Sequence, residues 1–239
     1  PRTSKRGGAW MTSYRTQKME NGKRIAPVVS IVCNFTKPTE NAPALLTFDE
    51  VSTFFHEFGH ALHGLLSNVT YESLAGTSVP RDFVELPSQI MENWAAEPEV
   101  MRIYAKHYKT GQVIPDALIE KMQAAITVDA ETFEKEAMTK INLPNTIIPR
   151  YRSTYFNHIF AGGYSAGYYS YIWSGVLDTD AFEVFKINGL FNSDYAKSFR
   201  KNVLEKGGTE DPMELYKSFR GAEPSVAPLL RKRGLDQVK

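Results

Sequence analysis

The sequence of 239 residues contains a single cysteine, Cys33, so one chain cannot form an internal disulfide. This absence is typical of a reducing compartment, and we expect a cytoplasmic protein, with the periplasm as the alternative. The sequence also lacks a run of the roughly 20 apolar residues that a membrane span requires. Its most apolar stretch, residues 25–35, is interrupted by Pro27, Ser30 and Asn34. We therefore expect no membrane partner.

An excess of charge of either sign is absent too, because 28 Lys and Arg residues oppose 27 Asp and Glu residues and leave a formal net charge of +1. Such a chain has no overall field that would draw it to nucleic acid, so we expect no nucleic-acid partner. Hydrophobic residues make up 42% of the sequence and aromatic residues 12%, which excludes disorder and predicts a buried core. Individual sequence motifs, and not overall charge, must therefore indicate what the protein binds.

The first part of the chain predicts a small β-sheet. Two stretches with β-branched and aromatic residues, 10–16 and 25–35, flank the sequence Glu-Asn-Gly-Lys at residues 20–23. Asn-Gly favours a tight turn with positive φ angles, so these residues predict a hairpin. We also expect a short strand within residues 69–77.

The strongest helical pattern covers residues 48–66, where Thr47 and Glu50 have the spacing of a capping box. Apolar residues then recur at the helical period. They are Phe48, Val51, Phe54, Phe55, Phe58, Ala61, Leu62, Leu65 and Leu66. A second helix is predicted to start near Asp82, which would be its N-cap, with Pro87 in or near the first turn. The rest of the sequence is mainly helical.

The first of these helices carries His-Glu-Phe-Gly-His at residues 56–60. In an H-E-x-x-H helix the two histidines lie on one face, about 6 Å apart along the axis, so both rings can bind one cation. Glu57 flanks that cation without binding it. His63 lies about 10.5 Å along the axis from His56, too far for three imidazoles to surround one ion. We expect His63 to be solvated or packed.

A catalytic zinc site needs a third protein ligand and an open position for water. Glu85 and Glu92 share one stripe of the second predicted helix. We favour Glu85, because it lies in the first turn and because Ser88 and Gln89 on the same stripe could orient ligand side chains. Spacing alone leaves open the alternative that Glu85 is the far member of a cap with Asp82.

Four segments of the sequence closely resemble the thimet oligopeptidase family of zinc metallopeptidases. They are residues 7–10 (GGAW), 56–63 (HEFGHALH), 82–89 (DFVELPSQ) and 158–164 (HIFAGGY). The resemblance covers nearly the whole chain, in the same order. It implies a zincin-like metallopeptidase catalytic domain, mainly α with a small antiparallel β-sheet beside the zinc helix.

The resemblance also implies an activity. One Zn²⁺ ion would be bound by His56, His60 and Glu85, and Glu57 would be the general base. The reaction expected is hydrolysis of peptide bonds in short peptides, with release of C-terminal dipeptides. Cleavage of internal bonds is the alternative within the family. A non-catalytic peptide-binding fragment is the alternative for the isolated chain.

Residues 151–173 hold six of the 12 tyrosines together with several glycines. A zinc hydrolase creates a tetrahedral oxyanion, and tyrosine hydroxyls or a histidine can donate hydrogen bonds to it. Gly162-Gly163 gives the backbone freedom just before Tyr164. The resemblance assigns substrate binding and transition-state stabilisation to His158, Tyr164 and Tyr171.

The resemblance implies that residues 1–239 form a metallopeptidase catalytic domain that is the C-terminal part of a longer chain. The N-terminal lobe of that chain would be its partner, and we expect a monomer. The first residue is Pro1 and not methionine, which agrees with a fragment. The segment of residues 122–145 is shorter than the resemblance implies, with an apparent loss of residues near positions 124–127. We interpret this as the position of a missing segment and not as a true deletion.

Overall fold

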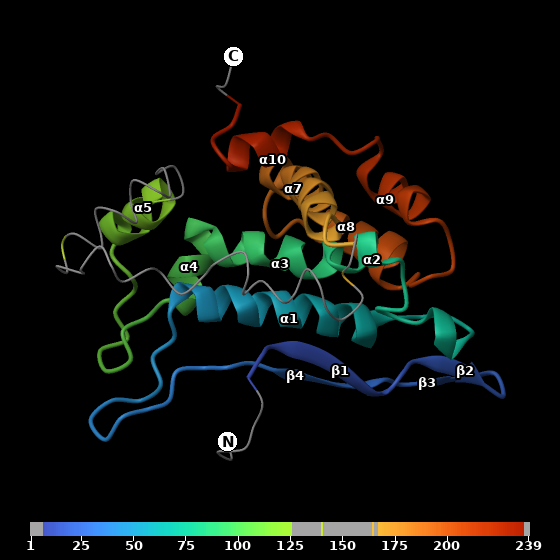
Figure 1. Cartoon of the computed structure of the whole chain (residues 1–239), viewed down its shortest axis with the longest axis horizontal. Helices are drawn as coiled ribbons and strands as arrows, with labels where there is room; N and C mark the ends of the chain where they lie inside the picture. The colour runs from blue at the N-terminus through green and yellow to red at the C-terminus, as the bar shows by residue number, and fades with distance from the viewer. Residues whose placement is uncertain (1–6, 126–139, 141–163, 165–166, 237–239) are drawn as a thin grey trace. The chain divides into compact units, whose positions relative to one another are not determined.

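A computed structural model describes residues 7–125, 140, 164 and 167–236 of the chain (Figure 1). The chain forms two compact units. One consists of Pro1–Glu97 with Ser170–Leu229, and the other of Pro98–Tyr169 with Leu230–Lys239. No helix among the described residues is long and apolar enough to cross a membrane.

The strands of the first unit form two antiparallel pairs. They are β1 (Trp10–Arg15) with β4 (Val28–Val32) and β2 (Lys18–Glu20) with β3 (Lys23–Ile25). Asn21 and Gly22 connect β2 to β3 with φ angles of 51° and 74°, as an Asn-Gly hairpin turn requires. The predicted hairpin is therefore confirmed. The β1–β4 pair lies along helix α1 (Figure 1).

Helices make up most of the rest, in both units. The first unit contains α1 (Phe48–Leu66), the 3₁₀ helix η1 (Glu72–Leu74), α2 (Arg81–Val84), α3 (Leu86–Ala96), α7 (Ser170–Asn188), α8 (Ser193–Phe199), the π-helical η4 (Arg200–Leu204) and α9 (Pro212–Arg220). The second unit contains α4 (Pro98–Tyr104) and α5 (Asp116–Ala125), and α10 (Ala227–Lys232) runs from the first unit into the second. The fold class, mainly α with a small antiparallel sheet beside α1, is confirmed.

Helix α1 has the bounds and the cap that the sequence predicts. Its N-cap Thr47 accepts a hydrogen bond from the Glu50 backbone N–H, and the Glu50 carboxylate accepts one from the Thr47 backbone N–H over 2.8 Å. The helix ends at Leu66, with Ser67 as its C-cap. The capping box satisfies backbone donors at the start of the helix that carries the two histidines.

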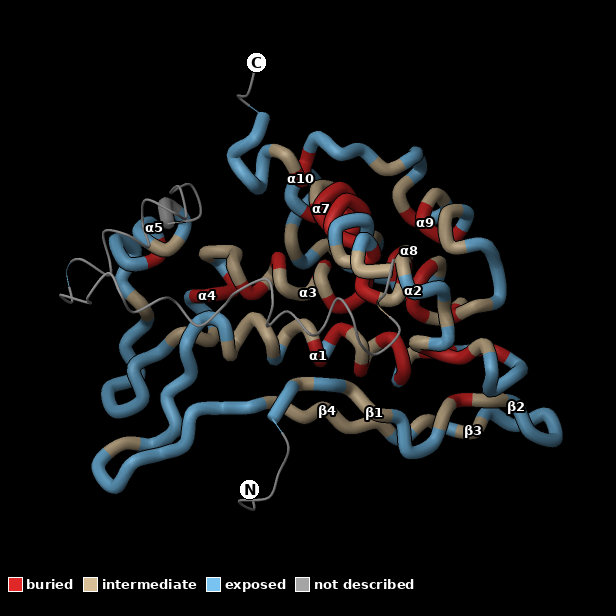
Figure 2. Tube along the Cα trace, in the orientation of Figure 1, coloured by how far each residue is buried: buried red, intermediate tan, exposed pale blue. Residues whose placement is uncertain are grey.

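The core of the first unit lies between α3, α7 and the helices that follow α7 (Figure 2). The Trp94 ring packs edge-on against Phe182 and Phe185, with ring centroids 4.6 and 4.7 Å apart. Leu86 and Ile90 of α3 are fully buried in the same cluster. Each such side chain contributes about 1.5–3 kcal/mol of burial energy, so α3 is held firmly against α7.

Residues 69–77 do not form the predicted strand. They contain η1, and Gly76 has a φ angle of 54° in the left-handed region. A Cβ atom at Gly76 would lie 3.0 Å from Gly64 Cα, because this loop packs backbone to backbone against α1. That tertiary contact selects the loop conformation, and the prediction of a strand is wrong.

The second predicted helix is divided in two. Helix α2 has Pro80 as its N-cap, so the prediction that Asp82 is the cap is wrong. Glu85 lies at the junction between α2 and α3, and Pro87 follows in the first turn of α3, as predicted. The backbone N–H of Glu85 bonds to the Phe83 carbonyl, and its side chain forms no cap.

Candidate metal centre

Helices α1 and α3 cross closely at Gly59. A Cβ atom at this position would lie 2.5 Å from Ser88 Cα and closer still to the Pro87 carbonyl oxygen. Real Cβ atoms do not approach backbone this closely, so only glycine permits the crossing. Because Gly59 lies between His56 and His60, the crossing brings the start of α3 to the face that carries both histidines.

The crossing brings together the three predicted metal ligands. His56 Nε2 and His60 Nε2 each lie 3.2 Å from Glu85 Oε2, and the ligand atoms of all three residues lie within 4.8 Å of one another. The two imidazole rings are nearly perpendicular, at 84°, with centroids 4.9 Å apart. Two nitrogens and one carboxylate oxygen thus converge on one point.

The spacing of these atoms fits a metal ion. Atoms about 2.0–2.1 Å from a tetrahedral zinc ion lie about 3.3 Å from one another. The two nitrogen-to-carboxylate distances of 3.2 Å agree with this value. The donor set of two imidazoles and one carboxylate is also one that zinc takes in hydrolases. The residues therefore fit a metal at this position.

Two further side chains of α3 contact the candidate ligands. The Ser88 hydroxyl donates to Glu85 Oε2 over 2.8 Å, as expected for a residue that orients a ligand. Glu92 Oε1 lies 2.6 Å from His56 Nδ1, on the ring nitrogen that does not face Glu85. The sequence placed Glu92 on the stripe of Glu85, but its contact with His56 was not predicted. Gln89 donates to the Tyr171 backbone carbonyl, which ties α3 to the start of α7.

The charged groups of the site shift the pKa values of Glu85 and His56. Burial opposes ionisation of Glu85, but hydrogen bonds and the charges of His56 and His60 outweigh it, so the pKa of Glu85 is lowered. Burial also opposes protonation of His56, but Glu85 and Glu92 outweigh it and raise the pKa of His56. The site therefore holds negative charge on Glu85 and attracts positive charge between the two acids.

Glu57 is buried near the candidate ligands, with a side-chain oxygen, Oε2, that has no hydrogen-bond partner within the described part of the chain. Burial raises the pKa of Glu57, against the opposing charges of His56 and His60. A buried carboxylate without partners on one oxygen is free to exchange a proton with a molecule that enters the site.

The sequence matches Peptidase family M3 in two overlapping segments, residues 1–139 and 125–235. The chain belongs to peptidase family M3. This confirms the family resemblance that the four sequence segments carry. Membership implies a metal cofactor, and His56, His60 and Glu85 form the group of described residues that could hold it.

The relatives that match the chain are peptidases by name. Dipeptidyl carboxypeptidase of Escherichia coli (strain K12) is 41% identical over 265 residues, covering 98% of this chain and 39% of that protein. Oligopeptidase A of the same strain is 41% identical over 266 residues, with the same coverage of 98% and 39%. Organellar oligopeptidase A of Arabidopsis thaliana is 39% identical and covers 98% of this chain and 34% of that protein.

This chain thus spans about two fifths of the length of the Escherichia coli relatives it matches. The alignments also extend over more positions than the 239 residues of this chain. The relatives therefore contain residues for which this chain has no counterpart. That the loss lies near residues 124–127 stays a prediction.

The predicted substrate-binding residues fall in different parts of the M3 chain. Tyr171 lies in the first turn of α7, in the same unit as the three candidate metal ligands, and its backbone accepts the hydrogen bond from Gln89. Tyr164 belongs to the second unit, where its ring contacts Tyr168 with centroids 5.9 Å apart. His158 lies outside the described residues.

His63 is fully buried and is not part of the ligand cluster. Neither ring nitrogen has a hydrogen-bond partner among the residues that the structure describes. Burial, assisted by the charge of His60, lowers the pKa of His63 to about 3. His63 is therefore a neutral packed side chain, which is one of the two roles that the helical spacing predicted.

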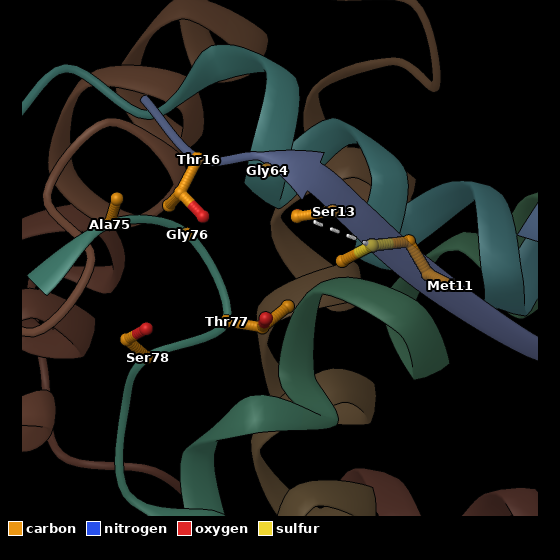
Figure 3. A pocket seen from close by; sticks show the side chains of 8 residues that line it. All are labelled: Met11, Ser13, Thr16, Gly64, Ala75, Gly76, Thr77 and Ser78. Atoms are coloured by element: carbon orange, nitrogen blue, oxygen red, sulfur yellow. Dashed lines mark hydrogen bonds between the residues drawn. The ribbon is translucent and has the colours of Figure 1, made fainter. Parts of the chain in front are cut away.

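A small hollow of about 140 Å³ lies between β1 and the loop that was expected to be a strand (Figure 3). It is lined by Met11, Ser13, Thr16, Gly64, Ala75, Gly76, Thr77 and Ser78. None of the three metal-binding candidates contributes to this lining. The hollow is therefore separate from the candidate metal centre.

Proposed function

We propose that the protein is a zinc peptidase that hydrolyses peptide bonds in short peptides. The observation that carries this proposal is the convergence of His56, His60 and Glu85 on one point, with 3.2 Å between each histidine nitrogen and the carboxylate. Family membership supports the reaction class. One zinc ion is proposed because the site offers one set of three ligand atoms.

Zinc, when bound, supplies Lewis acidity toward a peptide carbonyl and toward water. His56, His60 and Glu85 would hold the ion from one side. Glu57 would accept a proton from the attacking water and return it to the leaving amine. Its buried carboxylate is next in sequence to His56, and one of its oxygens has no partner among the described side chains and backbone groups.

Tyr164, Tyr171 and His158 are proposed to bind substrate and to stabilise the oxyanion. Support for Tyr171 is its place at the start of α7, in the unit that contains the metal ligands. The roles of Tyr164 and His158 rest on the sequence segment that they share with the family. Removing one oxyanion donor typically lowers kcat about 10²–10³-fold.

The central test is Glu57→Gln in the complete protein. We expect zinc content to stay the same, because Glu57 is not a ligand, and turnover of a short peptide to fall by about 10²–10⁴-fold, because the base is lost. Metal analysis and a peptide-cleavage assay measure the two effects. A variant that keeps full activity would refute the assignment of the base, and a wild-type protein without bound zinc would refute the proposed site.

Release of C-terminal dipeptides is proposed as the main activity, and cleavage of internal bonds is the second candidate. Both are supported, because a dipeptidyl carboxypeptidase and an oligopeptidase A are each 41% identical to the chain. Product analysis on a peptide of defined length discriminates between them. Sequential loss of dipeptides that stops when the C-terminus is amidated indicates the first activity, and internal cuts that tolerate amidation indicate the second.

We propose that the remainder of a longer chain covers part of this protein, which is then a monomer. Support comes from an exposed aromatic cluster in which Phe54 stacks on Phe58 and contacts Phe35, with each side chain close to two fifths exposed. Matched relatives are more than twice as long as this chain. The single cysteine supports a cytoplasmic location.

A further inference from the structure

Glu92 occupies a distinct place beside the candidate metal centre. It lies seven residues after Glu85, on the same stripe of α3, with Ser88 between them. Its Oε1 atom is 2.6 Å from His56 Nδ1, the shortest contact that any carboxylate in the described part of the site makes with a histidine. The side chain is 35% exposed, so the contact forms at the rim of the site and not in the core.

The chemistry of this contact determines which nitrogen of His56 carries hydrogen. A carboxylate can only accept a hydrogen bond, so the imidazole must donate from Nδ1. The lone pair of the neutral ring is then on Nε2, which faces Glu85 Oε2 at 3.2 Å. Glu92 therefore selects the tautomer and the ring orientation that a metal requires.

His60 offers a contrast within the same site. Its Nε2 atom also lies 3.2 Å from Glu85 Oε2, but its Nδ1 atom is buried without a hydrogen-bond partner among the described residues. Both rings meet Glu85 through Nε2, but only the Nδ1 side of His56 has a charged acceptor among the described residues. The two histidines are therefore fixed by different means.

We propose that Glu92 is a positioning residue that acts on the metal through His56. The proposal rests on the proposed zinc site, but not on the nature of the substrate. Among the three candidate ligands, Glu92 contacts only His56 in the described structure, so the His56 ring is the group that it can orient. Loss of such an acceptor typically lowers metal affinity or activity by about 10–100-fold.

The test compares Glu92→Ala and Glu92→Gln with the wild type in the complete protein. Zinc affinity is measured by competition with a chromogenic chelator, and the unfolding midpoint is measured on metal-free protein. We expect Glu92→Ala to weaken zinc binding about 10–100-fold. Glu92→Gln keeps an acceptor oxygen but loses the charge, so we expect a smaller loss. Both substitutions remove the charge that favours protonated His56, so we expect each to lower the metal-free midpoint by a small and similar amount.

A matched control is Glu97→Ala, which removes the same charge at the end of the same helix, where Glu97 lies 3.9 Å from Lys186. We expect its zinc affinity to equal that of the wild type. Zinc affinity of Glu92→Ala within about threefold of the wild type would overturn the proposal, because it departs from the expected range. A Glu92→Gln variant that binds zinc no better than Glu92→Ala would also overturn it, since an acceptor oxygen at this position would then have no effect on the His56 ring. A wild type that binds no zinc would instead refute the proposed function.

Discussion

We predict that Gly59→Ala disrupts the candidate metal centre, because α1 and α3 pack backbone to backbone at Gly59. The added Cβ atom would lie 2.5 Å from Ser88 Cα and nearer to the Pro87 carbonyl oxygen. Both are backbone atoms of α3, so no rotation of a side chain can relieve the clash. Helix α3 must move away from α1, and Glu85 and Ser88 must move with it.

The size of the movement follows from ordinary contact distances. Carbon atoms pack at about 3.5 Å or more, so α3 must move by about 1 Å. Metal ligands tolerate displacements of only about 0.2 Å. We therefore expect Gly59→Ala to lose most of its zinc affinity. We also expect overpacking to cost about 1–3 kcal/mol in the free energy of unfolding, which exceeds the gain of about 1 kcal/mol from replacing a helical glycine.

Gly64→Ala is the matched control, because Gly64 is a second buried glycine of α1. Its added Cβ atom would meet only side-chain atoms, the nearest being Val29 Cγ1 at 3.2 Å, which can shift by a few tenths of an ångström. Urea unfolding and chelator competition measure stability and zinc affinity in both variants. If Gly59→Ala binds zinc and unfolds like Gly64→Ala, the crossing does not set the geometry of the site.

Two further predictions concern buried groups outside the ligand set. Because the pKa of His63 is lowered to about 3, the unfolded chain takes up a proton below about pH 6.5 that the native ring does not. The metal-free protein should therefore lose up to about 1.4 kcal/mol of stability per pH unit as the pH falls from 6.5 to 3. His63→Leu should remove this part of the slope of stability against pH, whereas His107→Gln, at an exposed position, should not. Equal slopes in the wild type and both variants would contradict the reasoning. The buried Tyr216 hydroxyl donates to Asp180 Oδ2 over 2.6 Å, so Tyr216→Phe should lower the free energy of unfolding by about 1–3 kcal/mol and leave zinc affinity unchanged. Urea unfolding checks this, with exposed Tyr14→Phe as the control, and two equal unfolding midpoints would refute it.

Sequence patterns correctly predicted helix α1 and the hairpin turn, which depend on residues close to one another in the chain. The capping box of Thr47 and Glu50 and the apolar period fixed both ends of α1, and Asn21-Gly22 fixed the hairpin turn. The same helical period predicted that His56 and His60 share one face. These features depend on residues within one or two turns of each other, so a single sequence contains the information they need.

Features that depend on tertiary contact could not be predicted in this way. The loop at Gly76 has no strand because it packs against the backbone of Gly64, twelve residues earlier in the chain. The junction at Glu85 depends on how α2 and α3 pack, and spacing alone could not distinguish a ligand from a cap. The contact of Glu92 with His56 requires the crossing at Gly59, which no periodicity reveals.

The crossing also explains why one acid of α3 is a candidate ligand and the other is not. Glu85 meets the Nε2 side of His56, and Glu92, two turns later, meets the Nδ1 side of the same ring. Both contacts depend on one register of α3 against α1, since a shift of one residue turns a helix by about 100° and removes both acids from the ring. The candidate ligand Glu85 and the proposed positioning residue Glu92 are therefore coupled through a single packing contact. For the proposed zinc site, we expect binding to require the seven-residue interval between the two acids as well as glycine at position 59.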